Sequence, residues 1–297
     1  MVENEQANGR EPGQKEAVRL TAVPETALWT LHQRATEARR PGGVLDDPEA
    51  VDLADRIDFP FAERFGTSTL QSLVQGIRVR CFDREVEDFL TRHPRGTVVN
   101  LGDGLETQYW RVDNGRARWI SVDLPEASEL RARLLPAGPR QELVACSVTD
   151  PAWTERVDDS RGLLITAEGL LMYLRPPEVR ALLALLAERF PGATLVFDAV
   201  PRWFSRLAVE GRLRTHGYQA PPMPWGMDAR ERGKLATAHP GVAEIRDVRP
   251  ERTPGPLGAA LALAVRLPVL GGLRPTVTAV RFGSPGNHGL RTAVSTG

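Results

Sequence analysis

The chain has 297 residues, 41% of them hydrophobic, which is enough to bury a large core in one domain with appendages. Its 38 basic residues balance 38 acidic residues and aromatics make up only 6%, which argues against nucleic acid or an anionic membrane as a partner. Cys81 and Cys146 have neither metal-ligand spacing nor a disulfide framework, so we expect no metal. The beginning of the chain is polar, and no apolar stretch is long enough to cross a bilayer, so we expect a cytoplasmic protein.

The first part of the chain is predicted to be helical after a disordered tail. Residues 1–18 are charged and contain glycine, which is typical of disorder. Residues 19–96 then form an expected helical cap, in which Asp47 caps a helix that has Pro48 at its first position. The expected helices cover Glu25–Arg39, Ala50–Ile57 and Ser68–Leu90.

From residue 97 to residue 297 the pattern changes to apolar runs that alternate with helical segments. Alternation with short links predicts an α/β fold with a doubly wound parallel sheet. The expected later strands are Gln141–Cys146, Gly162–Thr166, Ala193–Asp198, Val242–Val248 and Thr276–Phe282. The expected helices are Leu105–Val112, Ala127–Leu134, Pro151–Val157, Glu178–Phe190 and Leu257–Val265, and the last dozen residues are expected to fray.

Residues 201–240 differ from the segments around them. Aromatic residues, methionines and prolines are set among charged residues, a composition that suits a lid over a pocket. An irregular surface insertion is the alternative. If the segment is a lid, the expected acceptor pocket contains Tyr173, Trp203, Tyr218 and Trp225.

The stretch Thr97–Asp123 carries the strongest signal for a ligand site. An apolar run ends at Gly102 and Gly104, which have no Cβ and let the backbone turn tightly and approach a ligand closely. Asp123 follows 21 positions after Gly102, the spacing of the acid that accepts hydrogen bonds from ribose hydroxyls in a βαβ nucleotide unit. The stretch therefore predicts a nucleoside site.

Two acids in the glycine loop indicate which nucleoside. Asp103 and Glu106 would each cost about 1–4 kcal/mol beside a pyrophosphate, which makes a nicotinamide dinucleotide an unfavourable ligand. The same acids are compatible with the ammonium and sulfonium groups of S-adenosylmethionine. The loop therefore favours S-adenosylmethionine as the cofactor.

Five motifs resemble one known family, the leucine carboxyl methyltransferase superfamily. They are PETALWTLHQRATEARRP, IRVRCFD, VVNLGDGLETQYWRVD, VDLPE and TAEGLLMYL, and the resemblance covers about residues 24–205. The first motif is most similar to the polyketide-biosynthesis branch of O-methyltransferases, of the tetracenomycin type. The resemblance implies a Rossmann-like class I methyltransferase with a seven-stranded, mostly parallel sheet whose last strand is antiparallel.

The same resemblance implies roles for individual residues. Arg80, assisted by Arg34, would pair with the carboxylate of the cofactor's methionine part, although a solvated helix position is the alternative for Arg80. Glu168 would lie near the transferring methyl group, or else cap a helix. The implied cofactor site comprises Arg34, Arg80, Gly102, Asp103, Gly104, Asp123, Leu124, Ser147, Val148 and Glu168, with Ser147 and Val148 beside the adenine.

Three positions depart from the family pattern. Asp103 replaces the usual alanine, Glu106 the usual aspartate, and Ser147 an acid that faces the adenine. Losing the charge-assisted bond at Ser147 would cost roughly 1–3 kcal/mol of cofactor binding. These changes raise the question of whether this chain is an ordinary methyltransferase.

The expected activity is O-methylation of a small polyketide-like metabolite at a carboxylate or a phenol, with S-adenosylhomocysteine as the product and a monomer or homodimer as the assembly. A phenol would benefit from a general base, for which His216 is the candidate, with an exposed loop histidine as the alternative. The alternatives are a cyclisation or rearrangement on the same fold, a protein carboxyl methyltransferase, a non-catalytic cofactor-binding partner and a nicotinamide-dependent oxidoreductase.

Overall fold

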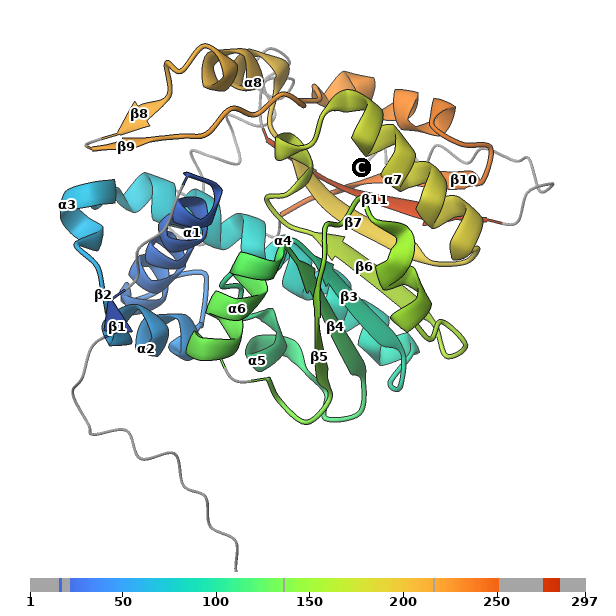
Figure 1. Ribbon diagram of the computed structural model, residues 1–297, viewed down its shortest axis with the longest axis horizontal. Helices are drawn as coiled ribbons and strands as arrows, with labels where there is room; N and C mark the ends of the chain where they lie inside the picture. Colours follow the sequence, from blue (N-terminus) through green and yellow to red (C-terminus); the bar gives the residue numbers. More distant parts are fainter. Residues whose placement is uncertain (1–15, 18–21, 136, 216, 251–274, 284–297) are drawn as a thin grey trace, which may run out of the picture.

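The protein is organised around one seven-stranded sheet (Figure 1). The computed structural model describes residues 16–17, 22–135, 137–215, 217–250 and 275–283. The strand order is β5-β4-β3-β6-β7-β11-β10, in which β11 is antiparallel to both neighbours and the other pairs are parallel. This confirms the expected α/β sheet with an antiparallel last strand. Its strands are β3 (Thr97–Leu101), β4 (Arg118–Asp123), β5 (Gln141–Ala145), β6 (Leu163–Ala167), β7 (Thr194–Ala199), β10 (Val242–Val248) and β11 (Thr276–Phe282).

The order in which strands are added reverses between β3 and β6. From β3 the chain adds β4 and β5 on one side, and it then returns to place β6 on the other side of β3. Open parallel sheets bind ligands outside the carboxyl ends of their strands at such a reversal. The loops after Leu101 and Ala167, where β3 and β6 end, therefore border the expected site.

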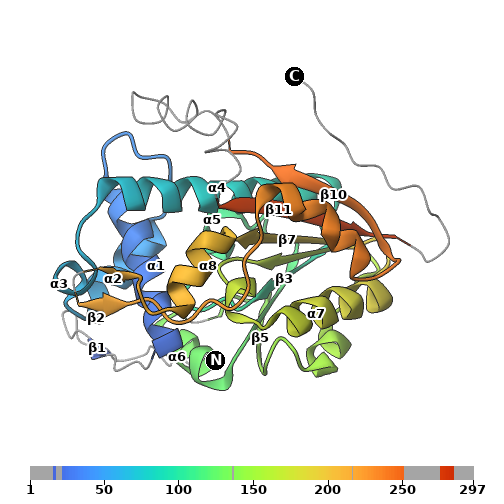
Figure 2. The ribbon, with the colours of Figure 1, turned by 90° about the horizontal axis from the view of Figure 1, so that it is seen from above.

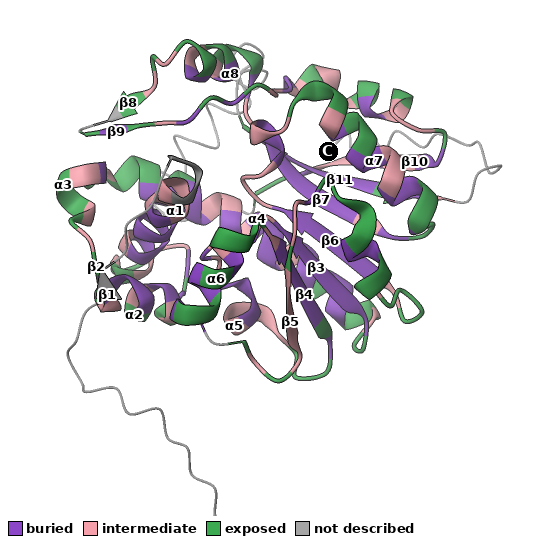
Figure 3. Ribbon diagram, viewed as in Figure 1, coloured by how far each residue is buried: buried purple, intermediate pink, exposed green. Residues whose placement is uncertain are grey.

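Helices cover both faces of the sheet. Val99 packs in a cluster with α7 on one face, and its neighbour Val98 packs in a cluster with α4 on the other. Figure 2 shows these two helices on opposite sides of the strands. Every residue of β3 and β6 is buried because neither face is open to water, and Figure 3 shows this burial across the sheet. The elements between strands are α5 (Gln108–Val112), α6 (Pro125–Leu134), η1 (Pro151–Arg156), η2 (Leu171–Tyr173) and α7 (Pro176–Arg189).

Within the part of the chain that the structure describes, four helices precede the sheet. Asp47 is the expected cap and accepts a hydrogen bond from the Ala50 amide (3.0 Å). Ser68, where the sequence predicts the start of a helix, also acts as a cap and accepts one from the Gln71 amide (3.3 Å). None of the helices within the described ranges is both long and apolar enough to cross a lipid bilayer. The four are α1 (Ala22–Arg39), α2 (Pro48–Arg56), α3 (Phe61–Phe65) and α4 (Thr69–Arg92).

A short strand lies where the sequence predicts a disordered tail. β1 (Glu16–Ala17) pairs in parallel with β2 (Ile57–Asp58), so the expectation of disorder over residues 1–18 is wrong at these two positions. The backbone groups of β2 provide hydrogen-bond partners for the backbone of β1, and the polar composition of the tail gives no sign of them. The rest of that tail, the expected helix 257–265 and the last dozen residues lie outside the described residues.

The segment of residues 201–240 connects β7 to β10, and its middle part reaches the N-terminal helices. Arg64 of α3 donates a hydrogen bond to the carbonyl of Gly217, and the ring of Phe65 meets that of Tyr218 edge-on with centroids 5.2 Å apart. Figure 1 shows β8 and β9 beside α3. The segment contains α8 (Arg202–Val209), β8 (Arg214–Thr215), β9 (Tyr218–Gln219) and η3 (Ala229–Thr237).

Candidate functional site

The glycine loop after β3 turns through two left-handed residues. Gly102 has φ 65° and Gly104 has φ 44°, values that residues with a Cβ rarely adopt. The Gly102 amide donates a hydrogen bond to the carbonyl of Val122 in β4 (2.8 Å), so the loop stays joined to the neighbouring strand. The backbone here is positioned by the sheet rather than by a helix.

The helix that follows this loop begins later than the sequence predicts. It was expected from Leu105, but α5 starts at Gln108. The Glu106 amide bonds to the carbonyl of Asp103 in a turn (2.8 Å), and the Glu106 side chain accepts from the Thr107 amide (2.9 Å). These two bonds hold the chain in a turn up to Thr107, the residue before α5.

Asp123 closes the loop from the end of β4. One carboxylate oxygen accepts from the Gly104 amide (2.7 Å) and the other from the Leu124 amide (2.8 Å). Burial raises the pKa of Asp123, while these two amides act in the opposite direction. Leu124 therefore takes part in this site through its backbone amide, since its side chain is exposed to solvent.

Asp103 lies beneath the loop and is fully engaged. Its carboxylate contacts the guanidinium of Arg131 (3.0 Å) and accepts hydrogen bonds from Ser121 (2.7 Å) and Asn100 (3.2 Å). Burial raises the pKa of Asp103, and Arg131 opposes this effect. The acid that departs from the family pattern is thus neutralised by this chain's own arginine.

Arg34 and Glu106 join α1 to the glycine loop. Arg34 is 1% exposed; it contacts the Glu106 carboxylate (2.8 Å) and donates to the carbonyl of Leu105 (2.6 Å). Burial alone would raise the pKa of Glu106, but Arg34 and Arg111 together lower it to about 2. The longer side chain at position 106 therefore carries a fixed negative charge between two arginines.

Arg78, which the sequence analysis did not single out, lies at the carboxyl ends of β6 and β7. It contacts Glu168 at 2.9 Å and Asp198 at 3.0 Å, and Asp198 also accepts from the Gly169 amide at 2.6 Å. Its Nε is buried and has no hydrogen-bond partner among the described residues. Burial raises the pKa of Glu168 to about 8, with Arg78 opposing the shift and the Glu106 and Asp198 carboxylates adding to it.

Arg80 is not brought to this cluster. Two positions on an α-helix are about 200° apart around its axis, so Arg78 and Arg80 face different directions. The Arg80 side chain is 36% exposed and lies near Asp83 (3.7 Å) and Glu87 (3.5 Å). The charged series Arg80, Arg84 and Glu87 at helical spacing is a sequence signal for this outward face.

The remaining expected residues divide between the site and the surface. After β5, Val148 is buried and Ser147 shares a hydrogen bond with Thr149 (2.8 Å between the two hydroxyl oxygens). The Tyr173 side chain is hydrogen-bonded to Thr26 of α1, and burial raises its pKa to about 12. Tyr218 is buried, and this burial raises its pKa. The nearby Tyr173 raises it further.

Two of the lid residues, Trp203 and Trp225, are not brought to the glycine loop. Trp203 is 46% exposed on α8, so the structure does not place it in a pocket. Trp225 packs on Phe197 of β7, with ring centroids 6.0 Å apart. His216 lies outside the described residues. The composition of residues 201–240 therefore does not predict where each aromatic residue lies.

Leu170 packs directly on Gly102, which yields a stability prediction. A Cβ at Gly102 would lie 2.8 Å from the Leu170 Cδ1, whereas a Cβ at Gly115, also left-handed with φ 75°, would meet nothing within 4 Å. We expect Gly102→Ala to lower the free energy of unfolding by about 1–3 kcal/mol more than Gly115→Ala, since overpacking adds to the shared backbone cost. Urea unfolding of both variants measures this, and equal losses would contradict it.

Comparison with known proteins agrees with this arrangement. The sequence profile of the leucine carboxyl methyltransferase family matches residues 27–187. The chain is 37% identical over 199 residues to the tetracenomycin polyketide synthesis O-methyltransferase TcmP of Streptomyces glaucescens, covering 67% of this chain and 73% of the relative. It is 26% identical over 208 residues to an S-adenosylmethionine-dependent methyltransferase of Mycobacterium marinum, covering 61% and 68%.

A solved structure agrees at the level of the fold. A methyltransferase from Thermobifida fusca superimposes with a TM-score of 0.50 at 18% identity, covering 86% of this chain and 94% of that one. The family profile spans more than half of the chain, and the sheet has the expected seven strands with an antiparallel last strand. The chain belongs to the leucine carboxyl methyltransferase family of S-adenosylmethionine-dependent methyltransferases.

Proposed function

We propose that this enzyme methylates an oxygen atom of a small, polyketide-like metabolite. The observation that carries the proposal is the 37% identity to an O-methyltransferase of tetracenomycin polyketide synthesis, which extends over two thirds of this chain. The family profile, which matches residues 27–187, includes the glycine loop. A shared acceptor class is therefore a better supported expectation than a protein substrate.

The residues at the carboxyl edge of the sheet fit the cofactor. Bound S-adenosylmethionine supplies a methyl group on an electrophilic sulfonium. Asp123 would hold the ribose hydroxyls, because its carboxylate already fixes the Gly104 amide at the end of β4 (2.7 Å). Arg78 would hold the carboxylate of the methionine part, since its Nε is a buried donor without a partner among the described residues. Ser147 and Val148 would border the adenine.

The N-terminal helices would act as the cover of this cofactor site. α1 contributes Arg34, which is ion-paired to Glu106, and α4 contributes Arg78, which contacts the Glu168 carboxyl group. The side chains of two helices that precede the sheet thus lie against loops that follow its strands. We propose residues 19–96 as a cap that excludes water from the transferring methyl group.

The acid–base chemistry of the neighbouring side chains favours an acceptor that is already ionised. Tyr173 and Tyr218 have raised pKa values and stay protonated near pH 7, so they can donate hydrogen bonds but cannot act as bases. A carboxylic acid is ionised at this pH and needs only alignment with the methyl group. We therefore propose a carboxylate oxygen as the acceptor and Tyr173 as a donor that orients it.

An acceptor screen tests this proposal. Purified enzyme and S-adenosylmethionine are incubated with aromatic polyketide acids and with their phenolic analogues, and S-adenosylhomocysteine is quantified beside the organic product. A product that alkali hydrolyses back to the acid is a methyl ester, which is the expected result. An alkali-stable methyl ether would identify a phenolic acceptor instead. Conversion of the acceptor without S-adenosylhomocysteine would contradict methyl transfer altogether.

Glu168 should release a proton when the cofactor binds. Its pKa of about 8 means that the carboxyl is protonated in the free protein at pH 6.5, where the cofactor's α-ammonium is charged. An ammonium placed beside Glu168 lowers that pKa, so we expect release of up to about one proton per cofactor at pH 6.5. Above about pH 9 Glu168 is already ionised and this release disappears.

Calorimetric titration in phosphate and Tris buffers measures this release, because the two buffers have different ionisation enthalpies. Glu168→Gln should bind without it, and methylthioadenosine, which lacks the ammonium, should release none from the unmodified protein. Equal release by Glu168→Gln and the unmodified protein would place the titrating group elsewhere.

A further inference from the structure

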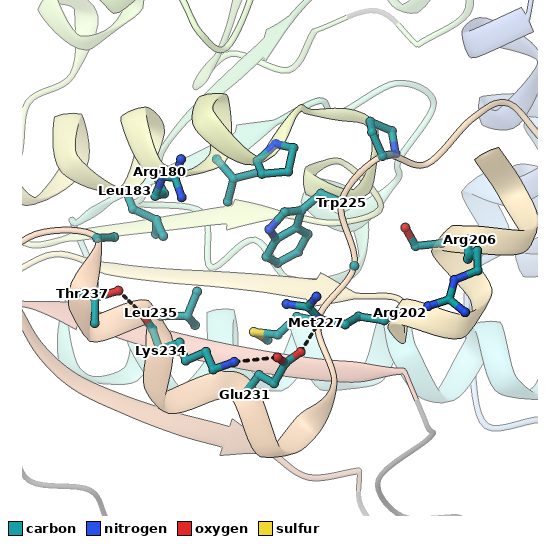
Figure 4. A pocket seen from close by; sticks show the side chains of 16 residues that line it. Arg180, Leu183, Arg202, Arg206, Trp225, Met227, Glu231, Lys234, Leu235 and Thr237 are labelled. Carbon is teal, nitrogen blue, oxygen red and sulfur yellow. Dashed lines mark hydrogen bonds and ion pairs between the residues drawn. The ribbon is translucent and has the colours of Figure 1, made fainter.

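A cavity of about 490 Å³ lies away from the glycine loop, between α7, α8 and η3. The residues that line it come from the first half of α7, the start of α8, the loop 224–227 and η3 (Figure 4). None of them is Arg78, Asp123 or Glu168. Its volume falls within the range of about 300–1,000 Å³ that small-molecule sites occupy. The proposed cofactor chemistry gives this cavity no role.

The walls of the cavity include apolar side chains, and one of them, Trp225, is held in place by its neighbours. In Figure 4 the Trp225 ring faces the hollow, with Leu183 of α7 and Leu235 of η3 across from it. Trp225 is held from behind by its amide, which donates to the carbonyl of Met172 (3.3 Å), and by its packing on Phe197. A flat apolar group can therefore rest on an indole that is already fixed, which reduces the entropy cost of binding.

The charges around these walls are predominantly positive. Four cationic side chains line the cavity beside one acid, Glu231. Arg202 and Lys234 both pair with Glu231, whose pKa these partners lower to about 2 although burial acts in the opposite direction, so the acid stays ionised. The side chain of Arg206, one turn after Arg202 on α8, makes no ion pair or hydrogen bond with any described residue. A positive charge is thus available at the α8 end.

We propose that this cavity is a second binding site, for an apolar molecule that carries one anionic group. The hydrocarbon body lies on Trp225 between Leu183 and Leu235, and the anion lies at Arg206 beside Arg202. An acid rather than a neutral molecule is favoured, because an uncharged ligand would leave the excess of positive charge uncompensated. The anion is best paired with a guanidinium whose donors no described residue engages, as at Arg206.

Two fluorescent probes with the same aromatic body test the proposal on the full-length protein. Anilinonaphthalene sulfonate carries the anion, and N-phenylnaphthylamine is its neutral counterpart. We expect the sulfonate to bind more tightly than the amine, with an affinity that falls as salt is added. Arg206→Glu should weaken the sulfonate about tenfold, because a like charge replaces an opposite one, and should leave the neutral probe within about twofold. Arg116→Glu, the same change on an exposed turn far from the cavity, is the matched control.

Two further measurements locate the bound probe. Energy transfer from tryptophan to the sulfonate should fall in Trp225→Phe, which keeps an aromatic wall but removes the donor beside the probe. Saturating S-adenosylhomocysteine should leave the probe bound. The proposal is overturned if S-adenosylhomocysteine displaces the probe, if both probes respond equally to Arg206→Glu, or if Arg116→Glu has the same effect as Arg206→Glu. Thermal melts of each variant confirm that the binding reports on folded protein.

Discussion

Replacing Arg111 with methionine is expected to lower the free energy of unfolding by about 3–5 kcal/mol, because it leaves buried carboxylates without their counter-charge. Arg111 contacts Asp47 at 2.6 Å, Asp83 at 2.9 Å and Glu106 at 2.7 Å, and only 5% of its side chain is exposed. Methionine fills a similar volume, so the loss of stability comes from the missing charge rather than from a cavity. Denaturant unfolding measures it.

The size of this effect follows from the position of Arg111 between three helices and the glycine loop. Asp47 caps α2, Asp83 belongs to α4, and Glu106 lies in the loop that leads to α5, the helix of Arg111 itself. The Asp47 and Asp83 side chains are fully buried. One guanidinium therefore holds the N-terminal helices to the site, and its removal should loosen α2 and α4 together.

The matched control is Arg118→Met at the start of β4. Arg118 pairs with Glu142 at 2.6 Å, but its side chain is 43% exposed, so water screens the pair and its loss should cost no more than about 1 kcal/mol. If Arg111→Met does not fold, Arg111→Lys keeps the charge and loses only the fork of hydrogen bonds. A cost for Arg111→Met as small as that for Arg118→Met would show that the buried network contributes little.

The strands of the seven-stranded sheet could be predicted from the sequence because each depends on local composition. The β-branched run before Gly102 and the alternating run Thr276–Phe282 identify β3 and β11. The cap at Asp47 is likewise predictable, since capping needs only a polar side chain three positions before an amide. Where neighbours in sequence determine the conformation, the prediction and the structure agree.

The ion pairs of the site could not be predicted in the same way. Arg78 meets Asp198 across 120 positions and Glu168 across 90, and nothing local to IRVRCFD indicates those partners. The helix start at Gln108 depends on Glu106, whose side chain is drawn to Arg34 of α1. Such features are set by tertiary contacts between distant segments, and these overrode the local preference for a helix from Leu105.

Arg78→Met is expected to raise the dissociation constant for S-adenosylmethionine about 10- to 150-fold, which is the loss of a charge-assisted hydrogen bond of about 1.5–3 kcal/mol. The physical reason is the buried Nε of Arg78, a donor at the carboxyl ends of β6 and β7 that no described residue satisfies. Asp123→Ala should weaken binding as well, because its carboxylate fixes the Gly104 amide.

Arg80→Met is the matched control, two positions away on the same helix. The Arg80 side chain is 36% exposed and faces Asp83 and Glu87, so its removal should leave cofactor affinity within about twofold. Calorimetric titration of both variants with S-adenosylmethionine and S-adenosylhomocysteine decides between the two arginines. Since Arg78→Met also leaves Glu168 and Asp198 without their partner, Arg78→Lys keeps the charge and serves as the folded comparison. A large loss in Arg80→Met with none in Arg78→Met would mean that α4 turns on its axis when the cofactor binds.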